Sequence, residues 1–440
     1  MCDAPVMPAA VPARERRALV PNKCVKCKAA RPHIAIRRIL YCKPCFVQAS
    51  VAKFRATHSR PRKNAGHART RTMVAFSGGA ASSALLRLAA DYQHLERRGT
   101  DAEPPYAGLV VGHVDETSLF PCAPEEAIRA AAAATGLACV TAALEDAFAP
   151  GGARAALAEL VHTATSTATD GGHIYTRLVR PGGDVTSRAR LAALFAGLDS
   201  ATDREDMLDI IKTALIVDMA RRAGCGAVLM GDSATRVATK AMALVSRGRG
   251  FSLPVDVGTE VQWLDDLAVH RPMRDFLAKE IAFFNRWTGQ RDIAVPGLVS
   301  GQPRGASIGR LAEAFVVELD QGFASTVSTV CRTLQKLEPS EAARSAPPCA
   351  LCGAPAESDA QEWRSRITIG GTDVQPPPPP SLLDIGPALC YSCQGLLHRT
   401  APGTALPGFC AARLEAGDRR EALRRQIDEC FIRDDCDAAQ

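Results

Sequence analysis

Residues 72 to 88 combine a short apolar stretch, a glycine turn and a run of helix formers, and this order constrains the fold more than any other part of the chain. Met73 to Phe76 predicts a buried strand, Ser77-Gly78-Gly79 a turn and Ala80 to Leu88 a helix. Glycines let backbone N–H groups converge, and a helix start adds unpaired donors and a positive dipole end. The turn therefore suits an anion such as phosphate, with a tight turn that binds nothing as the alternative.

The chain then alternates predicted strands and helices, which is typical of an α/β fold with a parallel sheet and helices on both faces. Strands are expected at 106–114, 138–144, 227–230 and 261–264, and helices at 125–134, 151–159, 188–198, 205–223, 234–246 and 271–287. Glycines and a proline predict a loop at 171–184. Residues 307–337 predict one or two helices that pack on this domain through the stripe Leu311, Phe315, Val316 and Leu319, and 413–431 predicts a charged helix.

A second strand, turn and helix repeat the opening design around Gly231-Asp232-Ser233. If both units belong to one sheet, their turns face the same crevice at the carboxyl ends of the strands. The polar side chains expected to line it are Ser77, Ser82, Ser83, Asp232 and Ser233. An alternative role for Asp232 is to cap the helix that begins near Ala234.

Eight of the sixteen cysteines form four C-x2-C pairs, which favours metal binding in a reducing compartment over disulfides. The first two pairs are Cys24, Cys27, Cys42 and Cys45, with a spacing typical of a structural four-thiolate zinc site. A redox pair and an iron–sulfur cluster are the alternatives. Most of the remaining cysteines are expected to be buried thiols.

The last two pairs are Cys349, Cys352, Cys390 and Cys393, and 37 residues that include the proline run 376–380 separate them. Loop closure costs little more for a long loop than for a short one, so the gap is compatible with a second zinc site. The chain is expected to contain a basic zinc-ribbon-like module at 1–70, an α/β domain with C-terminal helices at 71–338, and a zinc module with a charged tail at 339–440.

Positive charge is concentrated near the N-terminus, where residues 14–71 contain seventeen Lys or Arg and one acidic residue. Such a surface suits phosphate backbones, which favours nucleic acid as a partner over a merely solvated segment. Tyr41, Phe46 and Phe54 are expected in the core rather than stacked on bases. No apolar run approaches the roughly 18 residues of a membrane span, and the protein is expected in the cytosol or nucleus.

These motifs carry a resemblance to a known family. The Ser-Gly-Gly turn resembles the PP-loop of ATP pyrophosphatases, whose pattern is Ser-Gly-Gly-x-Asp-Ser, and residues 22–400 resemble the cytoplasmic tRNA 2-thiolation protein 2 family. The supporting stretches are Cys-Val-Lys-Cys-Lys at 24–28, Phe-Ser-Gly-Gly at 76–79, Leu-Met-Gly-Asp-Ser-Ala-Thr-Arg at 229–236, Arg-Pro-Met-Arg-Asp at 271–275, Lys-Glu-Ile-Ala at 279–282, Ser-Thr-Val-Ser-Thr-Val at 325–330 and Leu-Cys-Tyr-Ser-Cys at 389–393.

The resemblance implies a Rossmann-like PP-loop fold and a two-subunit tRNA sulfurtransferase. Such a complex thiolates wobble uridine 34 of the lysine, glutamate and glutamine tRNAs in the cytoplasm. ATP adenylylates the uracil, and a thiocarboxylated ubiquitin-like carrier supplies the sulfur. The implied partners of this chain are therefore a catalytic thiolase subunit, tRNA and, through the complex, that carrier.

The chain departs from the active pattern at three places. Ala81 stands where the PP-loop has aspartate, and Gly231 to Arg236 replaces Gly-His-Asn-x-Asp-Asp. Cys225 is the single cysteine between 146 and 330. Active thiolases use cysteines in this domain, one before and one after the second motif, to hold a cluster or carry sulfur. A lone thiol can neither hold a cluster nor supply an attacking and resolving pair.

These departures predict a non-catalytic subunit with no catalytic residues of its own. They also argue against ATP with Mg2+ as its ligand, because hard cations need oxygen ligands. The residues that still match the motif are Ser77, Gly78, Gly79 and Ser82. Two alternatives stay open: an ATP-dependent adenylylating thiolase in its own right, and a zinc-ribbon scaffold for protein partners.

Overall fold

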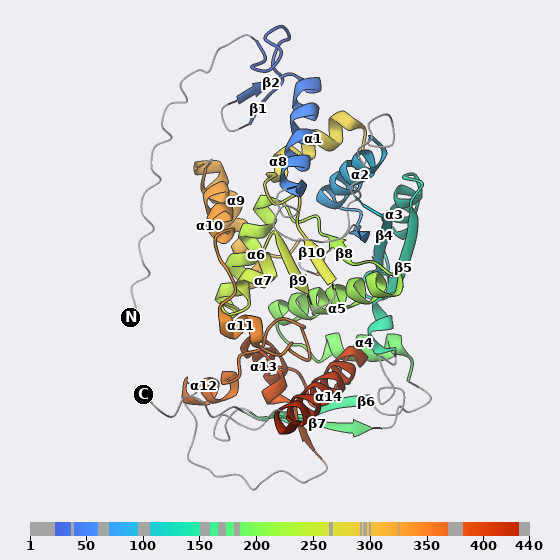
Figure 1. The fold of residues 1–440 in the computed structure, drawn as a ribbon, viewed down its shortest axis with the longest axis vertical. Coiled ribbons are helices and arrows are strands. Elements are labelled where there is room, and N and C mark those ends of the chain that lie inside the picture. Colours follow the sequence, from blue (N-terminus) through green and yellow to red (C-terminus); the bar gives the residue numbers. More distant parts are fainter. Residues whose placement is uncertain are drawn as a thin grey trace.

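A six-stranded sheet forms the centre of the computed structural model (Figure 1). Its strand order is β5 (Ala138–Ala143), β4 (Gly108–Asp115), β3 (Arg71–Ala75), β8 (Ala227–Leu229), β10 (Leu267–His270) and β9 (Glu260–Trp263). All neighbouring strands are parallel except the pair β9 and β10. The structure describes residues 23–36, 39–59, 70–95, 106–149, 159–165, 173–179, 185–263, 267–290, 293, 297–298, 301–323, 325–367 and 382–430.

Helices cover both faces of this sheet, as the alternating pattern predicts. On one face, Leu85 of α2 (Ala80–Leu95), Ile128 of α3 (Glu125–Ala133) and Phe284 of α8 (Ala278–Thr288) pack against Val74 and Val111 in one apolar cluster. On the other face, α5 (Ala201–Arg222) packs against β3, β4 and β8. The central strands are buried on both faces, which explains why their residues are almost continuously apolar.

The prediction of a loop at 171–184 is wrong, because part of this segment belongs to a second, three-stranded antiparallel sheet. Its order is β11 (Leu383–Asp384), β7 (Ile174–Val179) and β6 (Glu159–Thr165). The stretch Ile-Tyr-Thr-Arg-Leu-Val of β7 is rich in strand formers, but the glycines on either side of it concealed the signal. The helix expected at 151–159 lies outside the described residues except for Glu159, which begins β6.

The prediction of a helix at 271–287 is also wrong for its first turns. The chain leaves β10 at His270, turns at 272–276 and enters α8 at Ala278. Arg274 holds the turn because its buried guanidinium donates to the Val257 and Cys331 carbonyls, each at 3.2 Å, and to Thr259 Oγ1 at 2.6 Å. These acceptors come from other parts of the chain, so the local sequence does not reveal them.

Two helices fill the region expected at 307–337, namely α9 (Ile308–Gly322) and α10 (Thr326–Leu334). They pack on α6 (Ala234–Ser246), which α7 (Leu253–Val257) follows. The expected stripe is only partly buried: Val316 is 2% exposed, but Leu311 is 58% and Phe315 47% exposed. Ala312 and Val316 are the buried residues of α9, so the buried face is rotated from the one that was predicted.

The two cysteine modules lie at opposite ends of the molecule (Figure 1). The N-terminal module contains β1 (Ile34–Ile36), β2 (Ile39–Tyr41) and α1 (Lys43–Ser59), and the C-terminal part contains α11 (Glu341–Ser345), α12 (Ala360–Ile367), η5 (Gly386–Ala388), α13 (Tyr391–His398) and α14 (Gly408–Cys430). The remaining elements are η3 (Leu144–Phe148), α4 (Ser187–Ala196) and η4 (Arg304–Ala306).

Both modules share apolar clusters with the central sheet. Phe46 and Phe54 are buried beside Val74, which confirms their expected place in the core. The C-terminal cysteines and Leu389 belong to the same cluster as Met73 and Val110. The domain boundaries at 70 and 338 stay predictions.

Candidate functional site

The two glycine turns meet at the point where the strand order reverses. Strands β3 and β8 are parallel neighbours, with Thr72 opposite Ala227 and Val74 opposite Leu229. From β3 the chain continues to β4 and β5 on one side, and from β8 to β10 on the other. The Gly231 backbone lies so close to α2 that a Cβ there would be 3.1 Å from the Ser82 nitrogen. The expected juxtaposition of the two turns is therefore correct.

A crevice of about 700 Å³ opens between these turns. Six of the eight predicted residues line it, namely Ser77, Gly79, Ser82, Gly231, Asp232 and Ser233. Gly78 and Ser83 do not. Gly78 has φ +79°, and buried Ser83 donates from Oγ to the Gly78 carbonyl at 3.2 Å. These two residues shape the turn rather than contact the crevice, and the role of all eight in binding a nucleotide stays a prediction.

Serine hydroxyls stabilise the first turn and cap α6, the helix that follows the second turn. Ser82 Oγ donates to the Gly79 carbonyl at 3.0 Å and lies 3.3 Å from Ser77 Oγ. Ser233 is the N-cap of α6, because its side chain accepts from the Arg236 N–H at 3.2 Å. Asp232 is therefore not the cap that the sequence offered as its alternative role.

Asp232 instead accepts from Arg271 Nε at 3.2 Å. Burial opposes its ionisation, but Lys240, Arg271 and Arg236 outweigh this effect and lower the pKa of Asp232. No local pattern indicates this pair, because Arg271 follows β10 and reaches the crevice from the next strand in the sheet.

The crevice contains as many carboxylates as cations, and each carboxylate has a basic neighbour. The ion pairs are Glu116 with Lys212, Asp206 with Arg247, Asp232 with Arg271, Asp256 with Arg249 and Glu313 with Arg310. The negative charge of Asp209 raises the pKa of the Arg236 guanidinium. Four of these carboxylates pair with a cation of the same wall, and at the position of the PP-loop aspartate Ala81 supplies no carboxylate. The walls therefore fit Mg2+–ATP poorly.

Cys225, the lone thiol of the central region, is remote from this crevice. It is buried just before β8, at the amino end of the strand, whereas the turns lie at the carboxyl ends. Burial raises its pKa. The one cysteine among the described wall residues is Cys352, which belongs to the C-terminal pairs and which sequence reasoning did not place there.

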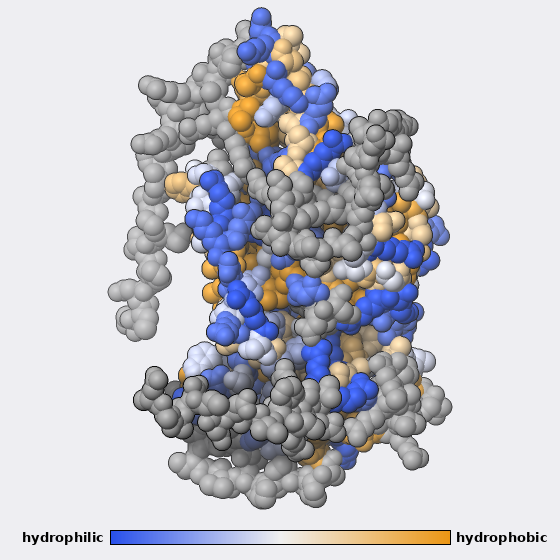
Figure 2. Space-filling model, in the orientation of Figure 1, coloured by the Kyte–Doolittle hydropathy of each residue, from blue (hydrophilic) through white to orange (hydrophobic). Residues whose placement is uncertain are grey.

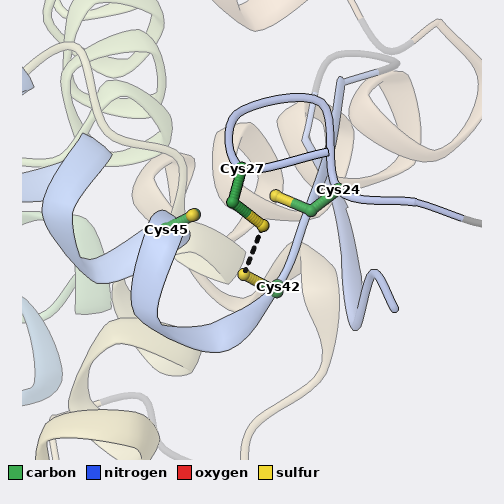
Figure 3. Close-up of side chains that lie close together, drawn as sticks. All are labelled: Cys24, Cys27, Cys42 and Cys45. Carbon is green, nitrogen blue, oxygen red and sulfur yellow. Dashed lines mark hydrogen bonds between the residues drawn. The ribbon is translucent and has the colours of Figure 1, made fainter. Parts of the chain in front are cut away.

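The N-terminal cysteines converge as predicted (Figure 3). Cys24 and Cys27 come from the loop before β1, Cys42 follows β2 and Cys45 is in α1. Their sulfurs lie within 4.8 Å of one another, with Cys27 and Cys42 at 3.9 Å. A tetrahedral site with metal–sulfur bonds of about 2.3 Å separates its sulfurs by about 3.8 Å. The geometry therefore fits one ion held by four thiolates.

The local backbone lowers the pKa of two of these thiols, Cys24 and Cys27. Burial opposes ionisation of Cys24, but backbone hydrogen bonds from Cys27, Cys42 and Lys26 lower its pKa to about 6. Lys28 adopts φ 55° and its N–H bonds the Cys24 carbonyl at 2.8 Å, which closes the knuckle. Cys27 is exposed, so this cluster is open to solvent on one side.

The C-terminal cysteines also form one cluster despite the long gap between their pairs. Cys352 and Cys390 sulfurs are 3.8 Å apart, and the Cys390 N–H donates to Cys349 Sγ at 3.3 Å. Gly353, at φ +76°, turns the first knuckle, and Cys390 precedes α13. All four cysteines, Cys393 included, are buried. The proline run 376–380 lies outside the described residues.

Part of the basic N-terminal surface supports the fold instead of facing solvent. Lys53 pairs with Glu280 at 2.7 Å, and the Arg55 guanidinium lies 5.5 Å from the Tyr92 ring centroid. Lys26, Lys28 and Arg31 are exposed. Figure 2 shows hydrophilic and hydrophobic residues side by side at this end of the molecule.

The fold and its two turns define a PP-loop-type α/β protein with a four-cysteine cluster at each end. Among solved structures, the U34-tRNA thiolase NcsA from Methanococcus maripaludis with its 4Fe–4S cluster has a similar fold, with a TM-score of 0.50, 13% identity, 73% of this chain covered and 90% of that one. No helix among the described residues is long and apolar enough to cross a membrane.

Sequence comparison identifies the particular family. Residues 307–395 match the family model of cytoplasmic tRNA 2-thiolation protein 2. The human protein of that name is 30% identical over 513 aligned positions, which cover 98% of this chain and 96% of the human one. The Bos taurus protein is 28% identical, and the alignment covers 95% of this chain and 94% of the Bos taurus one. The chain belongs to the cytoplasmic tRNA 2-thiolation protein 2 family.

Proposed function

We propose that this chain is a non-catalytic, tRNA-binding subunit of a cytosolic complex that 2-thiolates uridine 34 of the lysine, glutamate and glutamine tRNAs. Its partner is a catalytic thiolase subunit, which takes sulfur from a thiocarboxylated ubiquitin-like carrier. Membership of the tRNA 2-thiolation protein 2 family supports the reaction and the compartment.

The composition of the crevice is the observation that carries the non-catalytic assignment. Ala81 offers no carboxylate, and Arg236 brings a cation to the second turn. Activation of a uracil by ATP needs a held metal–pyrophosphate unit, and sulfur transfer needs free thiols. Cys225 lies at the other end of β8, and Cys352 belongs to the C-terminal cluster. The chain keeps the PP-loop framework without the groups that perform the chemistry.

Reconstitution tests the assignment directly. The purified chain, the catalytic subunit and their mixture are each incubated with ATP, a thiocarboxylated carrier and unmodified lysine tRNA, and 2-thiouridine is measured by mass spectrometry. We expect no product with this chain alone and the highest yield with the mixture. Thiolation by this chain alone would contradict the proposal.

The N-terminal module is the proposed tRNA contact, because exposed Lys26, Lys28 and Arg31 surround its cysteine knuckle. Phosphate contacts release counterions, so tRNA affinity should fall steeply with salt. The double change Lys28→Ala with Arg31→Ala should weaken binding and reduce the salt slope by about 2. The matched control is Arg344→Ala with Arg366→Ala, which removes two exposed arginines from α11 and α12. Equal losses in both variants would point away from the N-terminal module.

Zinc is the proposed ion of both cysteine clusters. Four thiolates at tetrahedral separations suit zinc and leave no position for water, so each ion would hold the fold rather than react. An iron–sulfur cluster is the alternative that metal analysis and visible absorption distinguish.

A second candidate function is ATP-dependent adenylylation of tRNA in the crevice itself, by a thiolase in its own right. The retained Ser77 to Gly79 turn, with Gly79 and Ser77 on the crevice wall, favours it. It requires tRNA-dependent pyrophosphate release by the lone chain that disappears in Ser77→Ala. We expect no release above a protein-free blank.

A further inference from the structure

The loop between α6 and α7 joins the crevice to the C-terminal cysteine cluster. Arg247 and Arg249 both line the crevice. Gly248 between them has φ +78°, and a Cβ there would lie 2.6 Å from the Tyr391 ring. Tyr391 lies in the sequence between two cysteines of the cluster, Cys390 and Cys393. The loop therefore rests directly on the knuckle that supplies half of the cluster.

Arg249 is a buried cation with little compensation from hydrogen bonds. Its side chain is 8% exposed, and its Nε atom is buried without a hydrogen-bond partner among the described residues. The nearest carboxylate is Asp256, with Oδ2 at 3.7 Å from Nε, and that oxygen already accepts from Ser252 Oγ at 2.8 Å. A buried guanidinium needs opposite charge close by, and one shared carboxylate supplies only part of it.

The cysteine cluster supplies the remaining negative charge. Burial opposes the charge of Arg249, but Asp256 and the sulfurs of Cys352, Cys390 and Cys393 raise its pKa. Cys352 lies on the crevice wall with Arg249. A divalent ion on the four thiolates would give the cluster a net charge of minus two by simple addition, next to the loop that carries the buried guanidinium.

We propose that Arg249 is the charge partner of the metal–thiolate complex in the C-terminal cluster, so that metal occupancy fixes the Arg247–Arg249 loop and one wall of the crevice. Without the ion the four sulfurs are no longer joined, so the knuckle against which Gly248 packs can move away and leave Arg249 with Asp256. The buried loop becomes costly to keep in place and opens. Arg247, which pairs with Asp206 on α5, transmits the opening to the crevice.

The N-terminal cluster is a natural internal reference. The strongest influences on its thiols are burial, backbone N–H groups and the other cysteines of the cluster. It is also open to solvent at Cys27. Changes at Arg249 should leave this site untouched.

The main test uses Arg249→Met, which removes the charge at similar volume, and Arg249→Lys, which keeps it. Metal release to a chromophoric zinc chelator is followed in the full-length chain loaded with zinc. In Arg249→Met we expect one ion per chain to leave about tenfold faster, a loss typical of residues that support metal ligands, while the other ion is unchanged. Arg249→Lys should retain most of the wild-type rate, and Arg247→Met, from the same loop, should retain both rates.

A spectroscopic measurement separates this role from general destabilisation. The cadmium-substituted chain should give two cadmium NMR signals in the four-thiolate region, and Arg249→Met should move only one of them. Identical release rates and unmoved signals in Arg249→Met would overturn the proposal.

The wild-type chain provides a test that does not depend on a folded variant. Hydrogen exchange is measured across 247–256 while chelator removes the ions one at a time. Protection of this segment should fall when the C-terminal ion leaves and not when the N-terminal ion leaves. Unchanged protection in the C-terminally depleted chain would refute the coupling.

Discussion

Two adjacent glycines in the first turn have different physical reasons to be glycine. Gly78 has φ +79°, and a Cβ there would lie 2.8 Å from Ile128 Cγ1. At Gly79 the nearest atom to a Cβ is Ser77 Oγ at 3.7 Å, an ordinary contact. The conformation of the turn therefore depends on Gly78, while Gly79 faces the crevice.

This difference gives a prediction with a built-in control. Gly78→Ala should lower the free energy of unfolding by about 1–3 kcal/mol, because it combines a left-handed backbone with a steric clash. Gly79→Ala should change it by less than about 1 kcal/mol. Urea unfolding followed by circular dichroism measures both. Equal costs would contradict the assignment of strain to Gly78.

The Asp232–Arg271 pair gives a second prediction at the scale of single residues. Asp232→Asn should cost about 1–3 kcal/mol of unfolding free energy, because partly buried Asp232 is ionised among cations. A carboxylate with a lowered pKa stabilises the fold above its unfolded pKa, and loses this effect only as the pH falls through the folded value. The difference between wild type and variant should therefore be constant from about pH 8 to about pH 5.5.

Asp218→Asn is the matched control, since Asp218 forms an exposed pair with Arg222 on α5. It should change the unfolding free energy by less than about 1 kcal/mol. A wild-type-to-Asp232→Asn difference that shrinks between about pH 8 and about pH 5.5 would mean that Asp232 titrates there, contrary to the direction of its pKa shift.

Among the secondary structure elements, α1 and α8 attach the N-terminal module to the sheet domain. Glu280 of α8 is buried, accepts from Lys53 of α1 at 2.7 Å and accepts from the Leu277 N–H at 2.9 Å. Phe46 of α1 packs edge-on against Trp287 of α8, with ring centroids 5.2 Å apart. The junction therefore combines one ion pair with aromatic packing.

Glu280→Gln tests the ion pair at this junction. The amide oxygen can still accept from Leu277, but the attraction to Lys53 is lost, and we expect a cost of about 1–2 kcal/mol in unfolding free energy. Asp91→Asn removes the exposed Arg87–Asp91 pair of α2 and should cost less than about 1 kcal/mol. Similar values for the two variants, by urea unfolding, would show that the junction does not depend on this charge.

For the whole molecule, the two cysteine clusters differ in access to solvent. Cys27 is exposed in the N-terminal cluster, whereas all four C-terminal cysteines are buried. Trp287 lies next to Phe46 in the first region, and the Trp363 ring lies 4.7 Å from the Tyr391 ring in the second. Each cluster therefore has a tryptophan that can report its state.

Metal removal should consequently occur in two stages. Metal analysis of the purified chain should find about two zinc ions. A chelator should release the N-terminal ion first, with a change in fluorescence that Trp287→Phe abolishes, and the C-terminal ion later, with a separate change that Trp363→Phe abolishes. Release of both ions at one rate, or a folded chain without metal, would contradict the prediction.

Local patterns in the sequence were sufficient for the features that depend on near neighbours. The strand–turn–helix units at Ser77 and Gly231 and the N-terminal cysteine knuckles follow from side-chain periodicity, glycine positions and cysteine spacing. The family resemblance rests on the same stretches. These features depend on contacts within roughly one supersecondary unit, which a sequence displays directly.

Only the tertiary structure decided the contacts between distant segments. Strand β7 pairs with β6 on one side and, on the other, with β11, about two hundred residues later. Arg274 and Arg271 find acceptors in segments that no spacing predicts. The same holds for the closing of the C-terminal cluster across 37 residues and for Arg249 beside it. The sequence by itself determined which turn could hold an anion. The packing around that turn determined that its charges are paired and that its wall rests on a metal site, because burial and charge pairing depend on the whole fold.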